Sequence, residues 1–164
     1  MVTLENVDLY FDLLEQIKNL NFKDSKNLLP LCEKSWPLIP DLIADTIKEY
    51  GSFDIAEIPA IERPLTYLAC RNDVEKLNFL SDLVNRYSEL EPWREMVSRA
   101  LNMIEVKNEI FSYIKQNPNV KQKDLKKVFP QIDYDLISEL LYAADHLELI
   151  ERTKSGNTYT LKLS

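Results

Sequence analysis

Four lysines within seven residues are the densest run of side chains in this sequence that could bind a polyanion. The run is followed further along the chain by two more cations, and the set is Lys121, Lys123, Lys126, Lys127, Arg152 and Lys154. Ammonium and guanidinium groups gathered in this way can contact phosphate oxygens. The alternative is a solvated helical face, because most charged runs only keep a surface hydrated. Which interpretation applies depends on the fold of the segments that contain these residues.

The other residues that could carry chemistry are few. His146 is the only histidine, Cys32 and Cys70 stand apart without CxxC spacing, and Gly51 and Gly156 are the only glycines. A zinc site, a nucleophilic triad, a P-loop and a dinucleotide-binding loop all need more of these residues or a different spacing. We therefore expect no metal, no cofactor and no enzymatic activity. The two cysteines are expected to be reduced, buried thiols in a cytoplasmic protein.

The charge of the chain is distributed unevenly. Its 164 residues include 27 acids and 20 bases, which gives a formal net charge of −7. Residues 1–104 hold 18 acids and 11 bases, whereas residues 105–164 hold nine of each. This difference indicates two modules, which we place at residues 1–103 and 104–164. No stretch reaches the roughly 18 apolar residues that a membrane span needs, so we expect no membrane partner.

The first module is predicted to be an acidic, all-helical domain. Apolar residues recur along it at helical spacing, and the shortage of glycine favours helices over sheets with many tight turns. Residues 52–64, with two prolines, are predicted to be a short extended connector. Since its negative charge would repel DNA, the open roles for this domain are dimerisation and the binding of a protein partner or effector. The long helix through Trp93–Ile114 either carries a homodimer seam or simply joins the two modules.

From Ile104 onward the predicted elements follow a definite order. One helix ends at Asn117-Pro118-Asn119, a short helix covers residues 120–129, and a third helix begins at Asp133, whose carboxylate can cap it. Apolar residues line one face of the third helix, namely Leu136, Ile137, Leu140, Leu141, Ala144 and Leu147. Two strands joined at Ser155-Gly156-Asn157 complete the pattern. The whole chain is therefore predicted to be mainly α, with one small β-hairpin.

This order of three helices and a hairpin resembles the winged-helix superfamily of helix-turn-helix DNA-binding domains. The resemblance implies that the third helix enters the major groove and that the hairpin, or wing, touches the adjacent backbone. It implies phosphate contacts from Lys121, Lys123, Lys126, Lys127, Arg152 and Lys154. It also implies base contacts from outward residues of the third helix, namely Ser138, Glu139, Tyr142 and His146. We therefore expect a protein that binds double-stranded DNA and regulates transcription, with a homodimer through the long helix as an open alternative.

An alternative arises from the charge of the third helix. It carries Asp133, Asp135, Glu139 and Asp145 and contains no lysine or arginine, which are the commoner base-contacting residues. Asp133 and Asp135 have local explanations, as a cap and as a partner of the helix dipole. Glu139 and Asp145 have none, and Glu148 stands where the family usually has glycine or another small residue. These acids favour an adaptor whose winged helix binds a protein instead of DNA.

Overall fold

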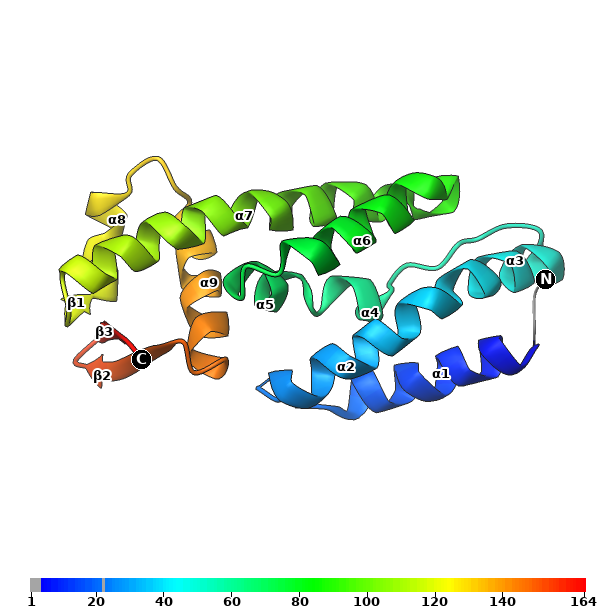
Figure 1. The fold of residues 1–164 in the computed structure, drawn as a ribbon, viewed down its shortest axis with the longest axis horizontal. Helices are drawn as coiled ribbons and strands as arrows, with labels where there is room; N and C mark the ends of the chain where they lie inside the picture. Colours follow the sequence, from blue (N-terminus) through cyan, green and yellow to red (C-terminus); the bar gives the residue numbers. More distant parts are fainter. Residues whose placement is uncertain (1–3, 22) are drawn as a thin grey trace. The chain divides into compact units, whose positions relative to one another are not determined.

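The fold was examined in a computed structural model, which describes residues 4–21 and 23–164. It is mainly helical and has one small antiparallel sheet near the C-terminus (Figure 1), which confirms the predicted fold class. Contacts divide the chain into two compact units. Unit 1 comprises Met1–Leu65 and Glu75–Ser98, and unit 2 comprises Thr66–Val74 and Arg99–Ser164. None of the helices in the described residues is long and apolar enough to cross a membrane.

Unit 1 is built from helices alone. Its elements are α1 (Leu4–Asn19), α2 (Ser25–Ser35), the 3-10 turn η1 (Trp36–Leu38), α3 (Ile39–Tyr50), α4 (Pro59–Glu62), α6 (Val74–Arg86), η2 (Ser88–Leu90) and the start of α7 (Glu91–Gln116). The first residue of α6 belongs to unit 2. The Asp24 carboxylate caps α2 by accepting the Asn27 N–H, 3.3 Å away. Gly51 ends α3 at a φ of +80°, a conformation that glycine adopts without steric cost.

The connector predicted over residues 52–64 is only partly extended. Its second half forms α4, because Pro59 occupies the first helical position and Glu62 accepts the backbone N–H of Ile58 at 2.6 Å. Trp36 is buried beside this helix and donates its Nε1–H to the Ala60 carbonyl at 2.8 Å. Pro59 therefore starts a short helix, whose Ala60 and Ile61 are buried in unit 1.

Unit 2 combines helices with the sheet. Its elements are α5 (Leu65–Cys70, except Leu65), the rest of α7, β1 (Val120–Lys121), η3 (Gln122–Asp124), α8 (Leu125–Val128), α9 (Tyr134–His146), β2 (Ile150–Ser155) and β3 (Thr158–Leu163). The predicted hairpin is confirmed as β2 and β3, with Gly156 at a φ of +62° in its turn. Asp133 caps α9 as predicted, since its Oδ1 accepts the Asp135 N–H at 3.1 Å.

The prediction of a helix over residues 120–129 is wrong for the first residues of that range. Val120 and Lys121 form β1, which pairs antiparallel with β3 and makes the sheet three-stranded in the order β1-β3-β2. Val120 lies opposite Leu161, which is fully buried, and a β-branched residue suits that position. Regular helix is left only at Leu125–Val128, after the 3-10 turn. A strand of two residues is too short to produce a recognisable alternation in the sequence.

The residue that links α9 to the wing has an unfavourable backbone conformation. Glu148 has a φ of +60°, and its N–H donates to the Asp145 carbonyl at 3.0 Å. This left-handed conformation costs a residue with a Cβ about 1 kcal/mol relative to glycine. We therefore expect Glu148→Gly to raise the free energy of unfolding by about 1 kcal/mol in urea titrations.

A matched control tests this interpretation. Glu151 is also an exposed glutamate, but it lies in β2 and is not among the residues with positive φ. Glu151→Gly should therefore lower stability, because glycine in a strand adds flexibility to the unfolded chain. If Glu148→Gly destabilised the protein as Glu151→Gly does, the backbone at Glu148 would not be under the strain described here.

Both cysteines are free and buried, Cys32 in α2 and Cys70 in α5. Burial is the main cause that raises the pKa of each thiol from 9.0 to about 12. We expect neither thiol to react with an aromatic disulfide reagent at about pH 8 in the native protein, and both to react in denaturant, because the thiolate is the nucleophile.

The same shifts give a stability prediction with a definite sign. The unfolded thiols ionise near pH 9, whereas the folded thiols keep their protons to about pH 12. The stabilising contribution is therefore complete below pH 9 and is lost as the pH rises toward 12. Urea midpoints measured between about pH 8 and 11 should fall in that window. Urea midpoints that stay constant from about pH 8 to 11 would contradict the raised pKa values of the two thiols.

Candidate nucleic-acid interface

The sequence-predicted lysines all lie on the surface of unit 2. Lys121 is on β1, Lys123 on η3, Lys126 and Lys127 on α8, and Lys154 on β2, and all five side chains are exposed. Within the described part of the chain, none of them forms an ion pair with a carboxylate. Their ammonium groups are therefore accessible to an anionic ligand.

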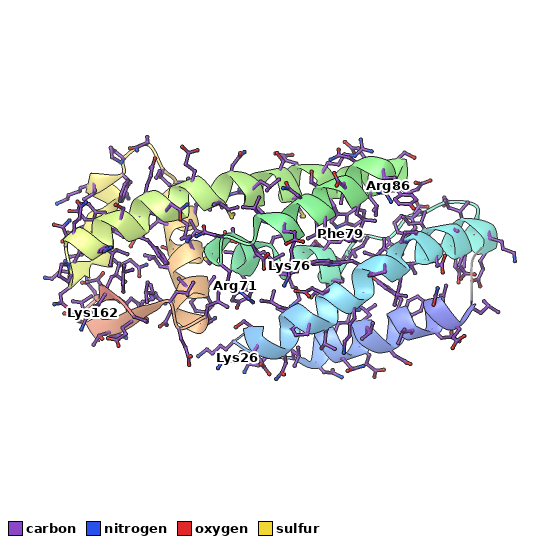
Figure 2. All side chains as sticks on the ribbon, in the orientation of Figure 1. Lys26, Arg71, Lys76, Phe79, Arg86 and Lys162 are labelled. Carbon is purple, nitrogen blue, oxygen red and sulfur yellow. The ribbon has the colours of Figure 1, made fainter. Side chains whose placement is uncertain are left out.

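The sheet register separates two of these lysines. Lys121 lies opposite Thr160, whereas Lys154 lies opposite Tyr159, and neighbouring positions along a strand point to opposite faces. Lys154 shares its face with the buried Leu161, and Lys121 is on the other face. Lys162, labelled in Figure 2, is two residues after Thr160 on β3, so the register places it on the same face as Lys121. The structure thus separates Lys121 and Lys162, on one face of the sheet, from Lys154 on the other face and from the lysines of η3 and α8.

Arg152 is not presented to solvent as the lysines are. Its side chain is only 10% exposed, and its Nε and Nη2 donate to Gln122 Oε1 at 3.3 and 3.2 Å. Its guanidinium carbon lies 4.1 Å from the centre of the Tyr159 ring, and Nη1 is 3.9 Å from Asp145 Oδ2. Arg152 therefore connects β2 to η3, β3 and α9 inside the unit.

Two of the predicted base-contacting residues bond to α5. Glu139 Oε1 accepts a hydrogen bond from the Thr66 hydroxyl at 2.6 Å, and the Tyr67 hydroxyl lies 3.3 Å from His146 Nδ1. Ala143, between them on α9, is buried. α5 could not be predicted from the sequence, because its nearly continuous apolar run has no helical periodicity.

The remaining two predicted base-contacting residues differ in exposure. Ser138 is half-buried, and its hydroxyl lies 3.4 Å from Gln122 Nε2. Tyr142 is 45% exposed, and its ring meets the His146 ring edge to face, with centroids 4.0 Å apart. Tyr142 is therefore the one of the four predicted base-contacting side chains that combines high exposure with no hydrogen bond to the described residues.

The lysines of η3 and α8 form the main part of a cationic rim on unit 2, and the outward residues of the neighbouring helix α9 are acidic. The ammonium groups of this rim are suited to binding anions. No group of three or more histidine, cysteine, aspartate or glutamate side chains within the described ranges could hold a metal ion. Comparisons of the chain with protein-family models, with curated proteins and with solved structures found no match.

Proposed function

We propose that unit 2 is a winged-helix domain that binds duplex DNA mainly through the phosphate backbone. The observation that carries this proposal is a set of exposed lysines on η3, α8 and β2 that have no ion-pair partner among residues 4–21 and 23–164, namely Lys123, Lys126, Lys127 and Lys154. Lysines that neutralise phosphates release condensed counterions, which supplies affinity whatever the base sequence. A cationic rim of this size is enough for such binding without any base contact.

The order of the elements supports the winged-helix part of the proposal. Helix α7 leads through β1 to η3 and α8, then to α9, and the β2–β3 hairpin follows (Figure 1). This sequence contains the three helices and the wing of the resemblance noted above. In that arrangement α8 and the wing flank α9, and Lys126, Lys127 and Lys154 would therefore lie where a duplex backbone passes.

Weak base selectivity forms part of the same proposal. Glu139 and His146 have partners on α5, and Arg152 bonds to Gln122, so Tyr142 is the main outward side chain left on α9 for a base contact. Specific binding usually depends on arginine, lysine, asparagine or glutamine at base edges. We therefore expect affinities for unrelated duplexes to differ by less than about tenfold, which is what one weak base contact can supply.

A second candidate function is an adaptor that binds a protein through the outward side of α9. The observation that favours it is the charge of that side, where Asp135 and Glu139 are exposed and α9 carries no lysine or arginine. Such a surface repels phosphates and suits a basic partner. The lysines of η3 and α8 serve only the DNA candidate, so their removal should abolish duplex binding and leave the binding of a protein partner by α9 unchanged.

The deciding experiment is a salt titration of duplex binding by the full chain. Four phosphate contacts predict that log K falls with log salt concentration with a slope of about −3.6. Fluorescence anisotropy with labelled duplexes of random sequence, from about 50 to 300 mM KCl, measures this slope. Absence of binding to every duplex at the lowest salt concentration would overturn the DNA proposal and leave the adaptor.

A further inference from the structure

A hollow in unit 1 is lined by an exposed aromatic ring and by two acids that have no ion-pair partner in the described part of the chain. The hollow lies between the α2–η1 junction and α6 and has a volume of about 600 Å³. Cavities of this size hold small organic ligands. Its walls include Trp36, Pro37 and Phe79, with Glu75 and Asp82 at the rim. We propose that this hollow binds a linear alkyl polyamine, and the proposal is independent of duplex binding by unit 2.

The aromatic wall is held rigidly from behind. Phe79 stacks on Trp36 with ring centroids 5.8 Å apart and an interplanar angle of 25°. Trp36 is only 4% exposed, and its Nε1–H is fixed on the Ala60 carbonyl. Phe79, labelled on α6 in Figure 2, nevertheless remains 47% exposed and lines the hollow. One face of its ring is thus available to an alkyl chain or to a cation.

Two carboxylates flank this ring along α6. Glu75 lies four residues before Phe79 and Asp82 lies three residues after it, so all three share one face of the helix. Both acids are exposed, and within the described residues neither has a hydrogen-bond or ion-pair partner. The third acid of the hollow, Glu33, differs because its Oε1 lies 2.5 Å from Lys76 Nζ. Glu75 and Asp82 are therefore the groups left to bind a cation.

The spacing of these groups selects the ligand class. Asp82 is seven positions after Glu75, which corresponds to about 10 Å along the helix axis. A ligand with ammonium groups at both ends and an alkyl chain between them can pair with both carboxylates while its chain crosses Phe79. A monoamine would reach only one carboxylate, and a short diamine would not span the two. The hollow therefore matches a long diammonium in charge, length and polarity.

The test is isothermal titration calorimetry of the full chain with 1,8-diaminooctane. We expect binding that is tighter than that of 1,4-diaminobutane or 1-aminohexane. Glu75→Gln with Asp82→Asn should weaken it about tenfold, since each exposed ion pair contributes modestly. Phe79→Leu should weaken it about three- to fivefold through the loss of the ring face. All three positions are exposed, so these variants should fold.

The matched control removes two carboxylates elsewhere in unit 1. Asp12→Asn with Glu15→Gln makes the same charge change on α1, where both residues are exposed and outside the hollow. We expect this control to leave the affinity for 1,8-diaminooctane unchanged. An equal loss in the control would show attraction to the general negative charge and overturn the proposal. Absence of binding, or binding insensitive to Phe79→Leu, would overturn it as well.

Discussion

The double variant Lys126→Glu and Lys127→Glu is expected to lose duplex affinity on the order of 100-fold at about 50 mM salt. Both lysines are exposed on α8 and have no carboxylate partner in the described residues, so their charge is available to phosphates. Each lost contact removes one counterion-release contribution, and each glutamate adds repulsion. The slope of log K against log salt should become shallower by about 1.8, because two phosphate contacts are gone.

The control for this variant is Lys121→Glu with Lys162→Glu. These two lysines are also exposed, but the register places them together on the outer face of the sheet, away from Lys154. The change in net charge is identical, so long-range electrostatics weaken binding equally in both doubles. We expect the control to lose less than about tenfold and to keep its slope. An equal loss in the two doubles would refute an interface on η3 and α8.

Local signals in the sequence were sufficient to predict several elements of the fold. Asp133 caps α9, Gly51 ends α3 and Gly156 occupies the hairpin turn, and each of these depends on one residue and its near neighbours. The apolar stripe of α9 likewise identified its buried face, on which Ile137 and Leu140 are almost fully buried. Such signals are legible because the interacting residues are close in sequence.

The features that the sequence did not reveal depend on distant partners. β1 exists because Val120 pairs with Leu161, a contact between residues far apart in the chain. α5 belongs to unit 2 through contacts of Thr66 and Tyr67 with α9. No periodicity in a single segment encodes such pairings. These long-range contacts also alter the candidate site, because Thr66 and Tyr67 contact Glu139 and His146, which were predicted to face outward from α9.

Arg152 shows the same limitation in a single residue. An arginine in the wing of a DNA-binding pattern suggests a phosphate contact by its type alone. Its partners come from three other elements, since Gln122 is on η3, Asp145 on α9 and Tyr159 on β3. The exposed fraction of only 10% follows from these contacts. We therefore infer that Arg152 holds the wing in place and does not itself bind the backbone.

Arg152→Ala is accordingly expected to lower the free energy of unfolding by about 2–4 kcal/mol. It removes the stack on Tyr159, worth about 1 kcal/mol, and the two hydrogen bonds to Gln122. It also leaves the amide oxygen of Gln122, a residue only 5% exposed, without these donors, at a cost of about 1–3 kcal/mol. Urea unfolding followed by circular dichroism measures the total.

Arg152→Lys separates a structural role from a phosphate contact. Lysine keeps the positive charge but cannot reproduce the planar fork that reaches Gln122 while it stacks on Tyr159. A structural role predicts a loss of about 1–2 kcal/mol in stability with an unchanged salt slope in duplex binding, because no phosphate contact is removed. If Arg152→Lys were as stable as the wild type and Arg152→Ala made the salt slope shallower by about 0.9, Arg152 would be a phosphate ligand after all. The pair of variants therefore assigns its role from two independent readouts.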